Sequence, residues 1–558
     1  MPSCTPRQFI LTPLFLLLLA AALSMTASNS VLADLCHPLV MESPIELKAD
    51  VNGWGLDNQN SRYVRSEAAG IDGKNVGSLE LDWAFALPDS KMPHSQPMIT
   101  TNVVYIADEP GVIYALDRRS GCTRWTFLAQ ASVRTAIRLI EPSTSEEEST
   151  RPLLVFGDAE AFVYAVDALS GKLVWRIKAD SHKKAMISGS PAFHNGRLYV
   201  PISSWEAFWA LNPFYSCCTF RSSVLALDAK TGEALWRTYT VTEEPKRTKQ
   251  RWLLPDLWGP SGAPVWSAPT IDEKRNTLYV GTGENYSSPA TEMSDAIIAM
   301  DLDTGVIKWH RQFLGNDAWN VSCSLLIDTN CPEENGVDLD FGAPPILTVH
   351  DRRAILLVGQ KNGVVRALDP NDSGKTLWER KLGRGGKLGG IHFGMAVDQR
   401  RDVLYVPVSD RHVYDLGGAE EGVAEPGLHA LALSTGDTLW YAPAEPCIEE
   451  DCFNGLSAAI TATEDLVFAA SLDGVLHAFD SASGARVWRF ETAKTFTAVN
   501  GVAEGGSVDL GGMYVSRGQL FVTSGYEVFD QMAGNAFLTF KVKDDASNEY
   551  HEHVDSQH

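Results

Sequence analysis

One pattern of apolar and polar positions recurs along the chain. A typical copy begins with alternating apolar residues that end in an Asp. A turn with Ser or Thr and Gly follows, and then a second short segment that ends in Trp. Residues 111–125, GVIYALDRRSGCTRW, are one example. Alternation predicts a half-buried strand, and the turn residues predict a tight reversal into a second strand. Each copy is therefore predicted to be a β-hairpin. The copies end at Trp125, Trp175, Trp236, Trp309, Trp378, Trp440 and Trp488.

Seven copies of a hairpin predict a ring of blades. A single four-stranded blade leaves its faces exposed, and it is stabilised only by packing against neighbours. The large Trp ring is predicted to fill the wedge between blades and reach the adjacent turn. Residues 79–83, ending at Trp83, and residues 535–540 supply the two halves of an eighth copy. We therefore predict an all-β, eight-bladed β-propeller, closed by pairing of the N- and C-terminal strands, which removes free sheet edges.

The two ends of the chain predict its domain limits and its compartment. Residues 1–33 combine Arg7, an apolar run at 9–23 and a small-residue site at Ala33, which is the order of a secretory signal peptide. We expect a secreted or periplasmic protein, with the propeller at 34–541 and a polar, disordered tail at 542–558. An uncleaved membrane anchor is the alternative for the first segment. No other segment is apolar enough to cross a bilayer.

Composition and charge narrow the possible partners. The 558 residues are 44% hydrophobic and 21% charged, which is typical of a globular protein with a large core. The formal net charge of -23 argues against nucleic acid as a partner, because nucleic acid is bound mainly through clustered Lys and Arg.

The cysteines favour disulfides over metal binding. Removal of residues 1–33 leaves eight of the nine cysteines, and an even number in an exported chain favours disulfides. No spacing resembles a paired zinc site. The connectivity stays open, and unpaired core cysteines at 217 and 218 are an alternative. Proximity suggests Cys323 with Cys331, Cys447 with Cys452 and Cys217 with Cys218, which leaves Cys36 for Cys122.

Several segments break the repeat and carry candidate chemistry. They are ASVRTA with Arg134, ISGSP with Ser188, YVPISSWEAFW with Ser203 and Glu206, GAPVWSAPT with Trp266, GTGENYS with Glu284, GNDAWNVSC with Asp317 and Asn320, and GQKNGVVRALD with Lys361. In these segments, from residue 52 to residue 540, the chain resembles the quinoprotein alcohol dehydrogenases. Within that family it is most similar to the polyvinyl alcohol dehydrogenase-like branch.

The resemblance implies pyrroloquinoline quinone (PQQ) as a cofactor over the central channel. It implies that Trp266 forms the floor under the quinone and that Arg134 pairs with a quinone carboxylate, as a planar guanidinium can. It also implies that Ser188 and Ser203 contact the quinone and that Lys361 polarises a quinone carbonyl oxygen. The alternatives are a packing role for Trp266 and surface roles for Arg134 and Lys361.

The resemblance also implies a calcium ion. Glu206 matches a bidentate calcium ligand, and Glu284 stands where the family has an Asn ligand, a change that keeps a hard oxygen donor. A disulfide between Cys217 and Cys218 matches the family's lid over the cofactor, although here the pair lies on a different loop.

The catalytic base is the point at which the chain departs from the family pattern. The methanol-oxidising members carry an Asp where this chain has Asn320, and an amide cannot act as a general base. Asp317 is the candidate substitute, and Asn320 is then a candidate calcium ligand.

These observations predict an exported PQQ- and calcium-dependent alcohol dehydrogenase. Its substrate would be polyvinyl alcohol or another primary or secondary alcohol. The sequence has no Cys-x-x-Cys-His haem motif, so a separate electron acceptor such as a c-type cytochrome is expected. The alternative is a non-catalytic propeller that acts as a scaffold for protein–protein interaction in the cell envelope.

Overall fold

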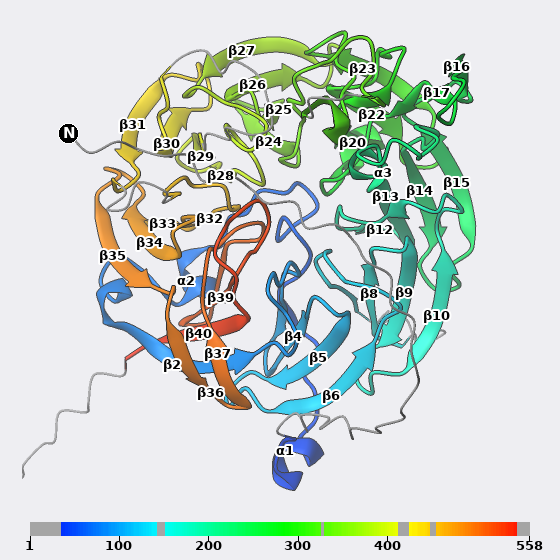
Figure 1. Ribbon diagram of the computed structural model, residues 1–558. Helices are drawn as coiled ribbons and strands as arrows, with labels where there is room; N and C mark the ends of the chain where they lie inside the picture. The colour runs from blue at the N-terminus through cyan, green and yellow to red at the C-terminus, as the bar shows by residue number, and fades with distance from the viewer. Residues whose placement is uncertain (1–34, 142–150, 325–328, 411–422, 447–452, 544–558) are drawn as a thin grey trace, which may run out of the picture. The chain divides into compact units, whose positions relative to one another are not determined.

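The computed structural model describes residues 35–141, 151–324, 329–410, 423–446 and 453–543. The predicted signal peptide, the Cys447–Cys452 pair and the tail from residue 544 lie outside these ranges. Eight sheets stand around a ring, so the predicted eight-bladed propeller is confirmed (Figure 1). Within the described ranges, no helix has the length and apolar character needed to span a membrane.

The first four blades follow one another between residues 49 and 312. Blade one contains β1 (Ala49–Val51), β3 (Met98–Thr100), β4 (Val103–Ala107), β5 (Val112–Asp117) and β6 (Thr123–Leu128). Blade two contains β7 (Arg138–Ile140), β8 (Leu153–Gly157), β9 (Phe162–Asp167) and β10 (Leu173–Lys178). Blade three contains β11 (Ala185–Met186), β12 (Ala192–His194), β13 (Arg197–Ser204), β14 (Ser223–Asp228) and β15 (Ala234–Tyr239). Blade four contains β19 (Thr270–Asp272), β20 (Thr277–Gly281), β22 (Ala296–Asp301) and β23 (Ile307–Gln312).

The remaining blades complete the ring. Blade five contains β24 (Ile346–His350), β25 (Arg353–Gly359), β26 (Val364–Asp369) and β27 (Lys375–Lys381). Blade six contains β28 (Ala396–Asp398), β29 (Val403–Val408), β30 (Gly427–Ala432) and β31 (Thr438–Pro443). Blade seven contains β32 (Thr461–Ala462), β33 (Leu466–Ala470), β34 (Val475–Asp480) and β35 (Arg486–Glu491). Blade eight contains β38 (Met513–Ser516), β39 (Gln519–Ser524), β40 (Ala536–Val542) and β2 (Leu79–Ala86).

Short elements lie outside the blades. The helices are α1 (Pro38–Glu42), α2 (Ser66–Ala69) and α3 (Glu206–Trp209), with 3-10 turns η1 (Val76–Ser78), η2 (Glu273–Arg275) and η3 (Val321–Ser324). Two-stranded sheets are formed by β16 (Lys246–Lys249) with β17 (Leu257–Gly259), β18 (Ser261–Gly262) with β21 (Asn285–Ser287), and β36 (Thr495–Ala498) with β37 (Gly501–Glu504).

The ring closes as the split repeat predicts. Strand β2 pairs antiparallel with β40, from Leu79 opposite Val542 to Ala86 opposite Ala536. Figure 1 shows these two strands, from opposite ends of the chain, side by side in one blade. The first and last parts of the propeller are thereby held in one sheet, and no blade is left incomplete.

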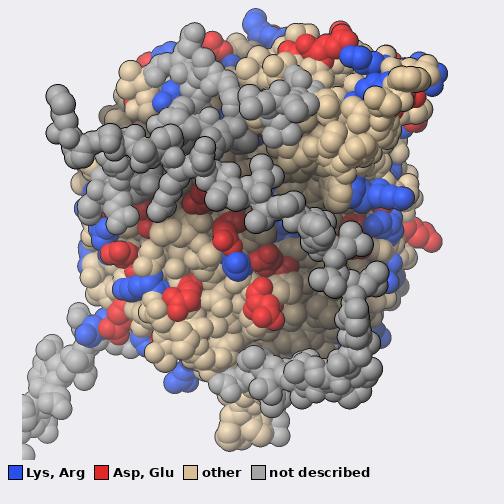
Figure 2. All heavy atoms as spheres, viewed as in Figure 1, with Lys and Arg blue, Asp and Glu red and all other residues tan. Residues whose placement is uncertain are grey.

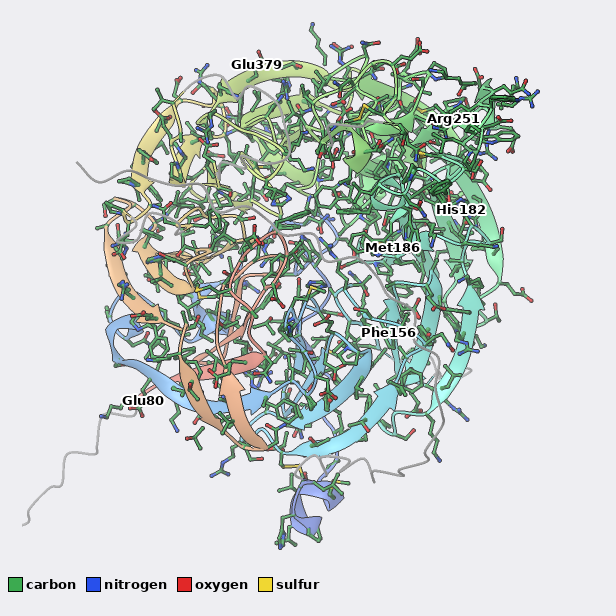
Figure 3. All side chains as sticks on the ribbon, viewed as in Figure 1. Glu80, Phe156, His182, Met186, Arg251 and Glu379 are labelled. Carbon is green, nitrogen blue, oxygen red and sulfur yellow. A yellow bond between two sulfur atoms is a disulfide. The ribbon has the colours of Figure 1, made fainter. Side chains whose placement is uncertain are left out.

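The repeated Trp packs on the next blade. Trp378 donates from Nε1 to the backbone carbonyl of Leu433 at 2.8 Å, and its ring covers Gly436 in the turn between β30 and β31. Seven of the eight repeat Trp rings cover a turn glycine of the following blade in this way. The predicted Trp docking is therefore confirmed. At the perimeter, outer strands carry exposed polar side chains such as Glu80 and Glu379 (Figure 3).

The turn glycine gives a direct test of Trp docking. Gly436 has φ +71°, and a Cβ added there would lie 2.5 Å from the Trp378 ring. Gly436→Ala is therefore expected to cost the left-handed strain plus about 1–3 kcal/mol for overpacking. The control is Gly196→Ala, because Gly196 has φ +77° and its Cβ would meet nothing within 4 Å. Chemical denaturation measures both losses, and equal losses would contradict Trp docking as a source of stability.

Three disulfides link described residues. They join Cys36 to Cys122, Cys217 to Cys218 and Cys323 to Cys331. The pairings suggested by proximity and elimination are confirmed for these six cysteines. The first of them connects the segment before blade one to the β5–β6 turn.

Candidate functional site

A cavity of about 200 Å³ gathers side chains from segments around the ring. Six of the predicted site residues line it: Arg134, Ser188, Ser203, Trp266, Glu284 and Lys361. These residues come from positions spread over more than 200 residues of sequence, and the structure brings them to one place. Met186, at the end of β11, also lines the cavity, and Figure 3 places it nearer the centre of the ring than Glu379.

Trp266 is fixed from several sides. Its Nε1 donates to the Asp340 carboxylate at 3.0 Å, and the rings of His392 and Phe393 meet it edge-on at 5.9 and 6.0 Å. The backbone of Gly342 lies so close that an added Cβ would be 2.2 Å from Trp266 Cη2. Trp266 therefore has a fixed orientation, as a floor for a flat ligand requires.

Three buried carboxylates meet beside this floor. Glu284, Asp338 and Asp340 each offer an oxygen, and these oxygens lie within 4.8 Å of one another. All three residues line the cavity. Such a group of oxygen donors suits a hard cation such as Ca²⁺. Glu284, the predicted calcium ligand, thus lies in a cluster with Asp338 and Asp340, which were not predicted.

Lys361 lies between the two aspartates. Its Nζ donates to Asp338 and to Asp340, at 2.9 Å in each case, and stands 5.5 Å from the centre of the Trp266 ring. Burial alone would lower the pKa of Lys361, but Asp338, Asp340 and Glu284 raise it well above its usual value. The lysine is therefore charged at neutral pH, and its ammonium holds both carboxylates in place.

Electrostatics distinguish the three acids. Burial raises the pKa of Glu284, and repulsion from Asp340 and Asp338 raises it further. Burial also raises the pKa of Asp338. Lys361 lowers this pKa, but repulsion from Asp340 offsets part of the lowering. The pKa of Asp340 is lowered, because Lys361 and hydrogen bonds overcome the effect of burial. Asp340 is thus a stable anion, and Asp338 holds a proton more readily.

Arg134 and the two serines occupy other positions on the cavity wall. Ser188 and Ser203 share a hydrogen bond of 2.6 Å between their hydroxyls. The Arg134 guanidinium lies 5.9 Å from the Phe393 ring, and Arg134 has no hydrogen bond or ion pair with any residue that the structure describes. An Arg facing a cavity without a carboxylate partner is suited to bind an anionic ligand.

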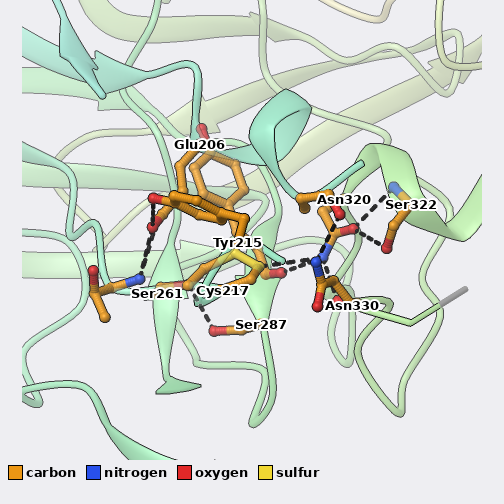
Figure 4. The surroundings of a disulfide bond; sticks show 12 residues. Glu206, Tyr215, Cys217, Ser261, Ser287, Asn320, Ser322 and Asn330 are labelled. Carbon is orange, nitrogen blue, oxygen red and sulfur yellow. Dashed lines mark hydrogen bonds between the residues drawn. A yellow bond between two sulfur atoms is a disulfide. The ribbon is translucent and has the colours of Figure 1, made fainter. Parts of the chain in front are cut away.

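Glu206 does not join the acidic cluster. It is fully buried, and its carboxylate accepts hydrogen bonds from Tyr215 Oη at 2.8 Å and from the backbone N–H groups of Thr219 and Phe220 at 2.9 and 2.8 Å. These donors occupy both oxygens and tie α3 to residues 215–220 (Figure 4). The geometry favours a structural role for Glu206 over the predicted one as a calcium ligand.

Asn320 and the adjacent cysteines also lie outside the cavity lining. The Asn320 amide donates to the carbonyls of Tyr286 and Asn330 at 2.9 and 2.8 Å and accepts from Ser322 at 2.7 Å (Figure 4). Its polar atoms are therefore occupied within the protein. Cys217 lines a separate cavity of about 280 Å³, and both cysteines of the Cys217–Cys218 disulfide are buried. The structure does not bring the predicted lid or the predicted Asn320 ligand to the candidate site.

Asp317 stands behind the cavity wall. Backbone N–H groups of Val337, Asp338 and Leu339 bond to its carboxylate, and burial and repulsion from Asp340 raise its pKa to about 6. It is buried and is absent from the cavity lining. Asp317 is thus placed to position the segment that carries Asp338, and it is not placed to touch a ligand there.

The sequence carried only a weak signal for Asp338 and Asp340. The two acids form Asp-Leu-Asp before Phe341-Gly342, in an insertion that breaks the repeat. Acidic residues in a long loop are usually solvated, so spacing alone did not separate them from loop residues. Their closeness to Glu284 arises only when blades four and five pack together.

Comparisons with known proteins show the family to which the chain belongs. The family model for the glucose/ethanol/alcohol dehydrogenase β-propeller domain (PQQ) matches residues 52–330, and that for outer membrane protein assembly factor BamB matches 361–508 and 424–545. Polyvinylalcohol dehydrogenases of a Pseudomonas species and of Sphingopyxis sp. (strain 113P3) are each 36% identical, over 87% of this chain and 74% of theirs. The quinohemoprotein alcohol dehydrogenase structure from Comamonas testosteroni has a TM-score of 0.64 at 19% identity, covering 91% of this chain and 82% of its own.

The fold and these matches define a class. The chain belongs to the PQQ-dependent alcohol dehydrogenase β-propeller family. Within that family, 36% identity over most of its length places it with the polyvinyl alcohol dehydrogenases. The sequence-based expectation of an enzyme is confirmed, and the alternative of a non-catalytic scaffold is not retained.

Proposed function

We propose that the chain oxidises hydroxyl-bearing carbons of polyvinyl alcohol, or of other primary and secondary alcohols, with PQQ and a calcium ion. The observation that carries the proposal is a cavity lined by the Trp266 floor, by the Lys361–Asp338–Asp340 group and by Arg134, which has no ion-pair partner among the described residues. The proposed substrate class comes from the two similar relatives, both of which are polyvinylalcohol dehydrogenases.

The residues present fit the quinone cofactor and the cation. Arg134 offers a guanidinium for a carboxylate of PQQ, and Trp266 offers a flat face that Gly342 keeps in position. Glu284, Asp338 and Asp340 would hold the calcium ion, which balances their buried charge. When bound, PQQ supplies the two-electron acceptor that the side chains themselves lack.

Asp338 is the proposed base, in preference to Asp317. The Asp338 carboxylate accepts a hydrogen bond from Lys361, whereas the Asp340 carboxylate accepts from Trp266, Lys361 and the backbone N–H of Glu284. A carboxylate that borders the cavity can accept the proton of a substrate hydroxyl. Lys361 keeps this carboxylate oriented and holds positive charge next to the floor.

Export and electron transfer complete the proposal. The Cys36–Cys122 and Cys323–Cys331 disulfides support an oxidising compartment, in line with the signal-like residues 1–33. We propose that electrons pass to a separate acceptor such as a c-type cytochrome. On the face shown in Figure 2, acidic and basic side chains are interspersed among the described residues.

Reconstitution tests the function and the metal ligands together. Purified protein with PQQ and Ca²⁺ is expected to gain a cofactor absorbance and to reduce a dye when given polyvinyl alcohol. Glu284→Gln is expected to weaken calcium binding by at least tenfold, because it removes one of three clustered charges. Glu206→Gln is the contrast, since the Glu206 oxygens are already bonded within the protein and calcium affinity should be unchanged.

Two results would count against these assignments. Absence of both absorbance and dye reduction would refute the dehydrogenase proposal. Loss of calcium binding in Glu206→Gln with retention in Glu284→Gln would restore Glu206 as the ligand. Isothermal titration with CaCl₂ measures both affinities.

A further inference from the structure

An apolar rim borders the mouth of the cavity. Trp205, just before α3, and Phe208, within it, line the cavity and are each 38% exposed. Phe529, in the loop between β39 and β40, lines it too and is 37% exposed. We call Trp205, Phe208 and Phe529 the aromatic rim. Large apolar side chains that stay partly in water beside a polar site indicate a binding surface.

The rim joins two distant parts of the ring. The Trp205 and Phe208 rings meet edge-on at 5.1 Å, and Phe208 stacks on Phe529 at 6.2 Å with 23° between the planes. Blade three thus touches the closing loop of blade eight, more than 300 residues further along the chain. The three rings form one continuous surface that leads to the carboxylates and Lys361.

Buried contacts hold the blade-three part of the rim rigid. The hydrogen bonds that Glu206 accepts from residues 215, 219 and 220 fix the start of α3 between Trp205 and Phe208. Lys184 Nζ stands 3.0 Å from the centre of the Trp209 ring at the other end of the helix. A preorganised apolar surface loses little entropy when it binds a flexible chain.

The chemistry of the cavity and rim together selects one kind of substrate. The cavity floor offers charged groups that suit one hydroxyl, and the rim beside it offers only ring faces and edges. A molecule that fits both must present a hydroxyl-bearing carbon with further carbon chain on either side. A short alcohol would contact the floor and leave the rim in water.

We propose that the aromatic rim binds the carbon backbone of an extended alcohol, so that the enzyme favours polymeric or long-chain secondary alcohols over short ones. The inference rests on the proposed function and deepens it, because it assigns selection for chain length to Trp205, Phe208 and Phe529. Removal of the rim should therefore raise the KM for a long substrate and leave the turnover of a short substrate almost unchanged.

Steady-state kinetics of the reconstituted enzyme test the rim. The double variant Trp205→Ala/Phe208→Ala is expected to raise the KM for polyvinyl alcohol at least tenfold, with kcat/KM for 2-butanol changed less than twofold. Phe214→Ala is the matched control, because Phe214 is 71% exposed nearby and does not line the cavity. An unchanged KM for polyvinyl alcohol in the double variant, or an equal rise in Phe214→Ala, would overturn the proposal.

A binding measurement separates this inference from the dehydrogenase proposal. Cofactor-free protein is titrated calorimetrically with polyvinyl alcohol, and the double variant is expected to bind at least tenfold more weakly. Polymer binding that depends on the rim in a protein inactive with every alcohol would support the rim and refute the dehydrogenase. Equal binding by the double variant and by the unsubstituted protein would refute the rim, whatever the activity. Circular dichroism confirms that each variant is folded.

Discussion

Replacement of Asp338 by asparagine is expected to lower kcat for alcohol oxidation by about 10²–10⁴-fold. The amide keeps the shape and an oxygen toward the cation site, but it cannot take up a proton. Asp338 borders the cavity, and Lys361 Nζ holds its carboxylate at 2.9 Å. Dye reduction by the reconstituted enzyme measures the loss, and calcium titration of the same sample shows whether the cation is still bound.

Asp317→Asn is the informative comparison. Asp317 lies behind the wall, where backbone groups of residues 337–339 bond to its carboxylate. An asparagine oxygen can still accept those bonds, so kcat is expected to fall by less than about tenfold. If Asp317→Asn is inactive while Asp338→Asn turns over normally, Asp317 is the base after all and the cavity must open toward it.

The fold could be predicted because its signal is repeated. Each Trp and turn glycine carries little information alone, but Trp378 on Gly436 follows the same rule as Trp83 on Gly121. Even the split blade could be predicted, because the strand that ends at Trp83 has no partner hairpin strand close to it in the sequence. Repetition fixes strand order and ring closure without knowledge of any single long-range contact.

Residues of the site could be predicted only where they stand in a recognisable local motif. Trp266 and Lys361 stand in segments that match the family, and both line the cavity. Glu206 sits in a matching segment too, yet Tyr215 and the amides of Thr219 and Phe220 occupy its oxygens. Those partners lie in an inserted loop, and the direction of a carboxylate depends on such neighbours and not on its own motif.

Asp338 and Asp340 show the converse case. No repeat or short motif marks them, and they reach Glu284 only through the packing of an insertion against blade four. With Asn320 in place of the Asp of the methanol-oxidising members, the proposed oxidation needs a carboxylate from elsewhere. That chemical requirement was visible in the sequence, whereas the residues that satisfy it depend on the path of the loop.

Lys361→Met is expected to destabilise the cofactor-free protein by about 3–5 kcal/mol in EDTA at pH 8, because buried carboxylates then lose their cation. Lys361→Arg keeps the charge and should cost less. Lys308→Met is the surface control, since Lys308 and Asp301 form a 3.2 Å pair that is partly exposed and should contribute about 0–1 kcal/mol. Urea denaturation gives the free energies of unfolding.

The pH dependence of that loss identifies its cause. Without the ammonium, the folded-state pKa of Asp338 and of Asp340 rises above their usual value of 3.8. An acid whose pKa is raised by folding loses stability as the pH climbs from its unfolded pKa through its folded pKa. Lys361→Met should therefore be less destabilised at pH 5 than at pH 8, and added Ca²⁺ should restore part of the stability at pH 8. A loss that is the same at both pH values would mean that Lys361 contributes through packing and not through its charge.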